Sequence, residues 1–210
     1  ENILGRIRKQ LSDDKLLMPF PEAEKNTTPL YPMPQFSAEE DFVMAFKALG
    51  GKFIFCDSEE DFATQMGILQ ANLGWKQILC TDKKLSAIMA GNGLSVEAPL
   101  GDTTEQADVC ITGCEALIGR TGSILLSSAQ PDGRTAPVFY PVHVVFAYLN
   151  QVHFELADGL KVLKAKYGTE LPSMINIATG PSRTADIEKT LVVGVHGPRE
   201  VYVALINAEI

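Results

Sequence analysis

The stretch KFIFCDSEEDFATQMGILQANLGWKQILCT, residues 52–81, decides the fold class. Its two ends, KFIFC at 52–56 and QILCT at 77–81, are apolar runs with the length of short buried strands. Between them, four apolar residues recur at helical spacing, namely Phe62, Met66, Leu69 and Leu73. Ser58 precedes this helix as an N-cap and Gly74 ends it. A strand, a helix and a second strand in this order predict a parallel sheet covered by helices.

The segments on either side of this unit continue the alternation. SAEE at 37–40 places a serine three residues before a glutamate, the pattern of a capping box at a helix start. Phe42, Phe46 and Leu49 then give that helix one apolar face. DKKLSAIMA at 82–90 predicts the next short helix.

The second half of the chain carries more strands than helices. Apolar runs predict strands at the following ranges: 107–113, 122–128, 142–149, 173–179, 191–197 and 201–206. The runs 142–149 and 201–206 are apolar on both alternating faces, which is typical of central strands. The polar loop 129–137, rich in glycine and proline, favours a hairpin or a pair of neighbouring strands. A helix is expected over roughly 153–167.

The chain divides into a main domain and a short N-terminal part. Its 210 residues, 46% hydrophobic and 21% charged, suit one globular domain. Residues 1–17 predict an amphipathic helix, and five prolines follow between 18 and 36. We therefore expect an N-terminal helix and Pro-rich linker over 1–36 and an α/β domain over 37–210.

Charge and composition exclude several classes of function. A net charge of -8 and a pI near 4.9 disfavour binding to a phosphate backbone, so no nucleic-acid partner is expected. No run approaches the ~20 apolar residues of a membrane span, and we expect a soluble, cytoplasmic protein. The four cysteines lie in or beside apolar strands without metal-ligand spacing, which predicts buried thiols and no metal or other cofactor in this chain.

A first candidate site is ATGPSRTADIE at 178–188, where a glycine–proline turn follows a buried strand. On one interpretation, Ser182 or Thr184 caps a short helix and the following acids suit its first turn. On the other, Arg183 beside the hydroxyls and Gly180 clamps a carboxylate or other anion at the carboxyl end of a strand. Spacing alone leaves both interpretations open.

A second candidate is GVHGPRE at 194–200, which repeats the pattern of an arginine after a glycine–proline turn. His196, before Gly197, is either a structural residue or a group that takes or gives a proton. Arg199 follows the turn. If the strands before the two turns are neighbours, both turns can converge on one ligand.

A third candidate is IGRTGS at 118–123, where Thr121, Gly122 and Ser123 offer hydroxyls and backbone N–H groups to an anion. The alternative is a plain turn before a strand. Glu115 and Arg120 flank this loop and are candidates for an acid and a cation. His143 and His153 lie in or beside apolar segments and are expected to be structural.

Together, TGPSRTADIE, GVHGPRE and the TGS turn resemble the lactate-utilization protein C family, whose single module is the LUD domain. The resemblance covers roughly 36–210, and the two C-terminal motifs in this order are specific. It implies a three-layer α/β/α fold similar to the ribose-5-phosphate isomerase, CoA-transferase and methenyltetrahydrofolate synthetase group.

The same resemblance implies a role in oxidising L-lactate to pyruvate. The partners it implies are a protein that carries iron–sulfur clusters and a third subunit, with this chain as a non-redox member. The family often has a glutamate before the Thr-Gly turn and a threonine after it, where this chain has Arg120 and Ser123. An arginine at that place favours a more anionic ligand than a glutamate does.

The sequence therefore supports three hypotheses. The leading one is a subunit of a lactate-oxidising system that binds a small carboxylate or other anion near Arg183, His196 and Arg199. The second is a stand-alone enzyme or binder of a phosphorylated or CoA-linked small molecule, because one fold hosts many chemistries. The third is an assembly scaffold in which these turns are structural.

Overall fold

A computed structural model describes residues 2–13, 34, 36–96, 107–185, 191–194 and 196–208. The chain separates into two compact units, Glu1–Met33 and Pro34–Ile210. In the first, helix α1 (Ile3–Asp13) falls within the predicted N-terminal helix. Most of the predicted linker lies outside the described residues.

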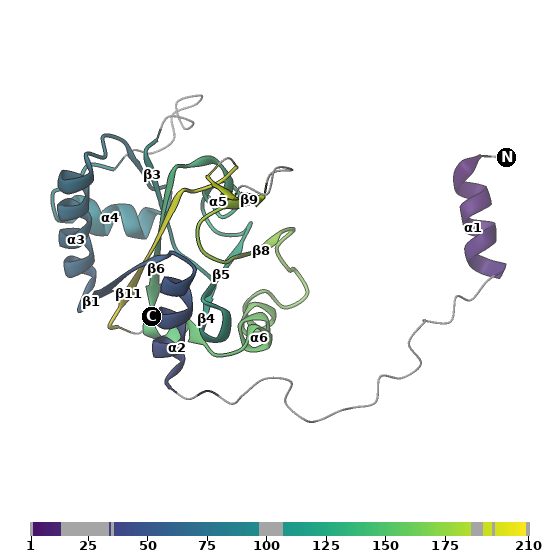
Figure 1. Cartoon of the computed structure of the whole chain (residues 1–210). Coiled ribbons are helices and arrows are strands. Elements are labelled where there is room, and N and C mark those ends of the chain that lie inside the picture. Colours follow the sequence, from purple (N-terminus) through teal and green to yellow (C-terminus); the bar gives the residue numbers. More distant parts are fainter. Residues whose placement is uncertain are drawn as a thin grey trace. The chain divides into compact units, whose positions relative to one another are not determined.

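The second unit is built on a five-stranded parallel sheet in the order β1-β11-β6-β3-β2 (Figure 1). The strands span these ranges: β1 Lys52–Cys56, β2 Ile78–Leu79, β3 Val109–Thr112, β6 Val142–Tyr148 and β11 Glu200–Ile206. All four pairings in the sheet are parallel. The prediction of a parallel sheet is confirmed, and β6 and β11 are central strands, as their two apolar faces indicate.

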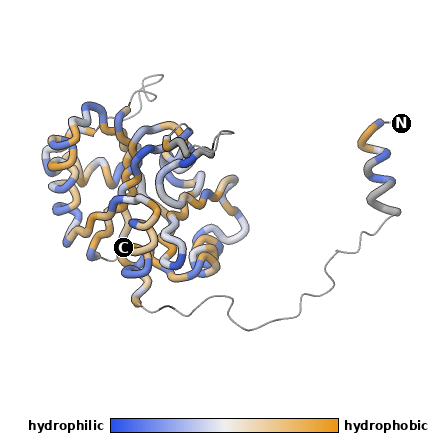
Figure 2. Tube along the Cα trace, viewed as in Figure 1, coloured by the Kyte–Doolittle hydropathy of each residue, from blue (hydrophilic) through white to orange (hydrophobic). Residues whose placement is uncertain are grey.

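Helices cover both faces of this sheet. Helices α3 (Glu59–Leu73) and α4 (Lys83–Gly91) pack on one face, where Phe62, Met66 and Met89 join a core with Phe146 of β6. Helix α2 (Ala38–Ala48) packs on the other face through Phe42 and Phe46. Hydrophobic residues follow the central strands, while the helices alternate hydrophobic and hydrophilic residues (Figure 2). The fold is a three-layer α/β arrangement.

A smaller mixed sheet, in the order β7-β4-β5-β8, extends the layer that contains α2. Its strands are β4 Ala116–Ile118, β5 Ser123–Ser127, β7 Val152–His153 and β8 Ile175–Ala178. Helix α6 (Leu156–Tyr167) packs on this sheet through Leu163. Two short 3-10 turns, Gly119–Thr121 and Leu149–Gln151, precede β5 and β7.

The local predictions at the helix starts are confirmed. Ser37 and Glu40 form both hydrogen bonds of a capping box at the start of α2. Ser58 accepts a hydrogen bond from the backbone N–H of Asp61, and Gly74 ends α3 with a left-handed φ of 69°. These residues fix where the helices begin and end, and therefore where the strands between them start.

In the second half, the expected strand pairing across the loop 129–137 and the helix-cap interpretation of Ser182 are wrong. The loop 129–137 does not join neighbouring strands, because β5 belongs to the smaller sheet and β6 to the central one, with the short helix α5 (Ala136–Phe139) before β6. No helix begins at Ser182. Instead, β9 (Arg183–Ala185) pairs antiparallel with β10 (Leu191–Val193). The helix expected over roughly 153–167 is confirmed as α6, which begins at Leu156 because Val152–His153 pairs with β4 as strand β7.

Candidate functional site

The two glycine–proline turns, 180–183 and 197–199, lie against each other. The backbone N–H of Ser182 donates to the carbonyl of Pro198 at 2.9 Å, and its hydroxyl donates to the carbonyl of His196 at 2.7 Å. The N–H of Gly194 donates to the carbonyl of Ser182 at 3.0 Å. Ser182 therefore joins two segments that the sequence could only suggest as neighbours.

A cavity of about 230 Å³, here called the turn cavity, opens beside these turns. It is lined by Pro137, His143, Asn176, Ala178, Thr179, Gly180, Pro181, Ser182, Pro198 and Val201. His143 and Val201 are paired residues near the amino-terminal ends of β6 and β11. The cavity thus lies beside the carboxyl end of β8, as predicted for the first candidate site, and at the amino-terminal end of the parallel sheet.

Close contacts explain the glycines in these turns. Gly197 has φ 123°, and a Cβ there would lie 3.0 Å from both the carbonyl oxygen of Pro137 and the Cβ of Ser182. Gly180 has φ 76°, with Leu49 of the segment after α2 only 3.1 Å from the position of a Cβ. L side chains rarely adopt these conformations, and a Cβ would also meet these neighbours. Glycine at both positions therefore allows the turns to pack closely.

His143 forms part of the wall of the turn cavity and is only 1% exposed. Its Nε2 lies 2.8 Å from the hydroxyl of Thr112 on the neighbouring strand β3. Burial lowers the pKa of His143 to about 4, so the ring is neutral at pH 7. Because Nε2 is engaged by Thr112, the ring leaves Nδ1 as a single donor or acceptor for a hydroxyl or carbonyl group of a ligand.

The Thr-Gly-Ser turn is connected to the cavity through hydroxyl groups. The hydroxyls of Thr121 and Ser123 are 2.7 Å apart, and Ser123 lies 2.9 Å from the hydroxyl of Thr179 in the cavity wall. Gly122 faces away from this chain of hydroxyls, because a Cβ there would lie 2.4 Å from the backbone nitrogen of Phe46. The turn supports Thr179, while its glycine allows helix α2 to pack closely.

The charged residues of the predicted site lie outside the cavity wall. Arg183 is exposed and donates from Nη2 to the carbonyl of Leu49, at the C-cap of α2. A cation at this place interacts favourably with the helix dipole. His196 and Arg199 are also exposed. Thr184 lies in β9, paired with Val192.

Glu115 and Arg120, which flank the same loop, contact different partners. Arg120 forms an ion pair with Glu155, with Nε 2.9 Å from the carboxylate, and stacks over the ring of Phe154. Glu115 is buried and pairs with Lys166 at 2.9 Å. The acid and the cation are therefore held in separate groups and do not form one site.

A larger cavity of about 510 Å³ lies between α2 and β1. Its lining is apolar apart from the carboxylates of Glu39 and Glu40. The turn cavity is smaller, but a histidine, an amide and hydroxyls converge there. Specific recognition of a small molecule depends on such groups, so we regard the turn cavity as the candidate site.

The family model of the LUD domain matches residues 71–206, which is more than half of the chain. This range includes every residue of the turn cavity wall. The chain belongs to the LUD domain family. The resemblance seen in the sequence is confirmed.

Curated relatives of this LUD domain align with about half of the chain. "Lactate utilization protein C" of Halalkalibacterium halodurans is 40% identical over 114 residues, which cover 50% of this chain and 47% of that protein. The protein of the same name from Bacillus subtilis is 32% identical over 105 residues, 49% of this chain and 44% of that protein. The chain thus spans about half the length of the curated relatives it matches.

A solved structure supports the fold of the LUD domain. The crystal structure of a DUF162 family protein from Deinococcus radiodurans matches with a TM-score of 0.62 and 20% identity, over 84% of this chain and all of that one. At this identity the match shows the fold and not the function.

Other sequence predictions concern metals, thiols and membranes. The four cysteines are buried and unpaired, as predicted. In the described ranges, no three His, Cys, Asp or Glu side chains are placed to hold a metal ion, and the expectation of no cofactor in this chain stays a prediction. None of the helices in the described part of the chain is both long and apolar enough to cross a membrane.

Proposed function

We propose that this chain acts in lactate utilization by binding a small 2-hydroxy or 2-keto acid in the turn cavity. The observation that carries the proposal is the buried, neutral His143 in the wall of a small polar cavity between the two family motifs. The names of the relatives support the substrate class. L-lactate and pyruvate are the ligands to test first.

The cavity wall offers groups that match such an acid. His143, Thr179 and Asn176 carry donors and acceptors for a hydroxyl or keto oxygen and for a carboxylate. Arg183 follows Ser182 and Arg199 follows Pro198, so each arginine is adjacent in sequence to a residue of the wall. In this proposal the two arginines provide positive charge beside the cavity, and the neutral wall provides the hydrogen bonds.

The proposed role is that of a non-redox subunit. Oxidation of lactate to pyruvate removes two electrons, which require an acceptor. The resemblance assigns this task to an iron–sulfur protein, with a third subunit beside it. In the proposal, the LUD domain holds the organic acid while the partner carries the electrons.

Ligand binding is tested by thermal shift and calorimetry on the purified chain. We expect L-lactate or pyruvate to raise the melting temperature of the wild type, since a ligand that binds only the folded state stabilises it. His143→Gln is expected to weaken binding about tenfold or more, equivalent to about 1.4 kcal/mol. His153→Gln is the matched control, because His153 lies on β7, away from the cavity wall. Unchanged binding by His143→Gln, or no binding of either acid, contradicts the proposal.

The role of the arginines has its own test. The double variant Arg183→Ala, Arg199→Ala is expected to weaken binding of the acid about three- to tenfold at low salt, and the difference should shrink at high salt. Arg134→Ala is the control for loss of a surface arginine, because Arg134 donates to Ser173 and is not in the cavity wall. If affinity and its salt dependence match the wild type, the arginines have only the structural role seen for Arg183.

A further inference from the structure

A second cluster of polar side chains lies at the opposite end of the central sheet. Strands β2, β3 and β6 end at Leu79, Thr112 and Tyr148, and the segments after them enclose a pocket of about 170 Å³. Ligands of open α/β sheets bind at this carboxyl end. The pocket, here called the lysine pocket, includes Lys84 of α4 and Lys166 of α6 in its wall.

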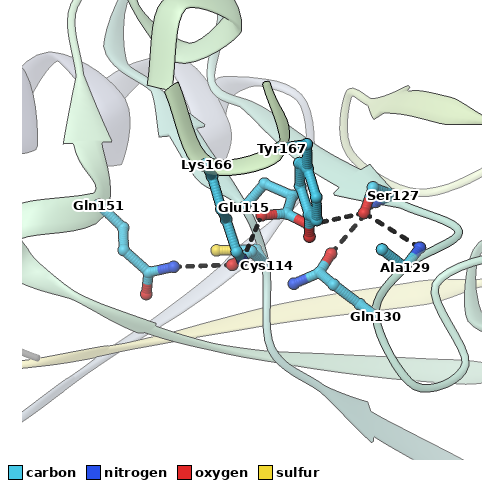
Figure 3. Close-up of polar contacts among 8 residues, drawn as sticks. All are labelled: Cys114, Glu115, Ser127, Ala129, Gln130, Gln151, Lys166 and Tyr167. Atoms are coloured by element: carbon cyan, nitrogen blue, oxygen red, sulfur yellow. Dashed lines mark hydrogen bonds and ion pairs between the residues drawn. The ribbon is translucent and has the colours of Figure 1, made fainter. Parts of the chain in front are cut away.

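A buried glutamate holds Lys166 in place. The side chain of Glu115 is 3% exposed and accepts hydrogen bonds from Ser127 at 2.6 Å, Tyr167 at 2.7 Å and Lys166 at 2.9 Å (Figure 3). Burial alone raises the pKa of Glu115, but these three donors outweigh it and the net pKa is lowered. Glu115 is therefore charged at pH 7, and the ammonium group of Lys166 is fixed beside it.

Lys84 is held in a similar way. Its ammonium group donates to the hydroxyl of Tyr148 at 2.6 Å and lies 3.2 Å from the carboxylate of Glu59. The hydroxyl of Tyr148 in turn donates to Glu59. Within the described residues, Lys84 thus contacts Tyr148 and Glu59, and Lys166 contacts Glu115 and the ring of Tyr167.

A fixed amide adds another donor. The backbone N–H of Ser127 donates to the side-chain oxygen of Gln130 at 3.1 Å, which identifies the other end of the amide as its NH₂ group. This nitrogen is directed toward Gly113, in the wall of the pocket. Figure 3 shows Lys166 and the amide nitrogen of Gln130 extending toward Cys114 from different sides.

The carboxylates near the pocket are occupied. Glu59 and Glu115 hold the lysines from outside the pocket wall. Asp82 is in the wall, but its Oδ1 accepts from the backbone N–H groups of Lys84 and Leu85 as the N-cap of α4. Besides Oδ2 of Asp82, the wall offers the ammonium groups of Lys84 and Lys166 and the amide of Gln130, which approach from α4, α6 and the turn after β5.

We infer that the lysine pocket binds a phosphate group, free or carried by a small molecule. Two ammonium groups and an amide approach the pocket from different elements, and lysine ammonium groups bind phosphate as point charges. The site is separate from the turn cavity, and no residue belongs to both walls. It does not depend on the proposed role in lactate utilization.

The test is a titration of the full chain with inorganic phosphate, in which calorimetry and ³¹P NMR measure binding. We expect Lys84→Met and Lys166→Met each to weaken binding about tenfold or more, as loss of a charged donor does. Lys161→Met is the matched control, because Lys161 lies on α6 and pairs with the exposed Asp158. Glycerol phosphate in a parallel titration shows whether a carried phosphate binds more tightly than the free ion.

A second variant keeps the test valid if Lys166→Met destabilises the fold. Gln130→Glu preserves the acceptor for the N–H of Ser127 and replaces the NH₂ donor with a negative charge, so it should weaken phosphate binding about tenfold with an unchanged melting temperature. His143→Gln should leave phosphate binding intact, which separates this site from the turn cavity. Phosphate binding that no pocket variant weakens, binding of acetate in place of phosphate, or no phosphate binding up to ~10 mM overturns the inference.

Discussion

Replacing Gly122 with alanine is expected to destabilise the protein by about 4 kcal/mol or more, at the upper end of single substitutions. Gly122 has φ 61°, and an added Cβ would lie 2.4 Å from the backbone nitrogen of Phe46 and 2.7 Å from the backbone carbon of Ala45. Neither backbone atom can move without shifting helix α2. Urea unfolding monitored by circular dichroism measures the loss.

The control for this effect is Gly74→Ala. Gly74 has a similar φ of 69°, but nothing lies within 4 Å of the position of a Cβ. Gly74→Ala therefore has the backbone strain without the clash. It should lower the free energy of unfolding by only about 1 kcal/mol. Equal losses for the two variants would mean that α2 does not pack on the Thr-Gly-Ser turn as described.

Acidification is expected to remove more stability from the wild type than from His143→Gln. Burial lowers the pKa of His143 from 6.5 to about 4, so between these values the unfolded chain binds a proton that the folded chain does not. This contribution to stability is present in full above pH 6.5 and is lost as the pH falls toward 4. A pKa shift of this size corresponds to a loss of about 3 kcal/mol in the free energy of unfolding between pH 6.5 and pH 4.

The measurement is the free energy of unfolding at several pH values between 7 and 4 for both proteins. The carboxylates, including Glu115, are the same in both, so the difference between the two curves isolates His143. His143→Gln will itself lower stability at pH 7, because Thr112 loses its buried partner. The two curves should approach each other toward pH 4. Parallel curves would show that the pKa of His143 is not lowered in the folded state.

Local sequence signals predicted the elements of the fold well, because they act over a few residues. The caps at Ser37 and Ser58 and the stop at Gly74 all form as expected. The two-sided apolar pattern of 142–149 and 201–206 identified the central strands. Such signals did not predict which of the two sheets each strand joins. The run 122–128 reads as a strand, but nothing local assigns it to a second sheet.

The candidate site was predictable only in part. The two glycine–proline turns were visible, yet their contact through Ser182 depends on β8 and β11 meeting from different sheets. His143 was expected to be structural, because a lone histidine among valines gives no sign of a cavity. The only available signal was a polar residue in an otherwise apolar central strand. Arg183 stood out by its charge, although its visible contact is with Leu49.

The lysine pocket shows the same limit more strongly. Lys84 and Lys166 are 82 residues apart by their numbers, and each looks like an ordinary solvated lysine on its helix. Only the buried carboxylate of Glu115 and the hydroxyl of Tyr148 bring their ammonium groups to one pocket. Such a site depends on long-range packing, which no spacing rule describes.

The most direct test of acid binding in the turn cavity is a crystal structure of the full chain with L-lactate or pyruvate at saturating concentration. We predict that the acid lies in the turn cavity, with its hydroxyl or keto oxygen within hydrogen-bonding distance of His143 or Thr179. An acid bound only at another place, or an unoccupied turn cavity in crystals of a protein that binds the acid in solution, would contradict the account.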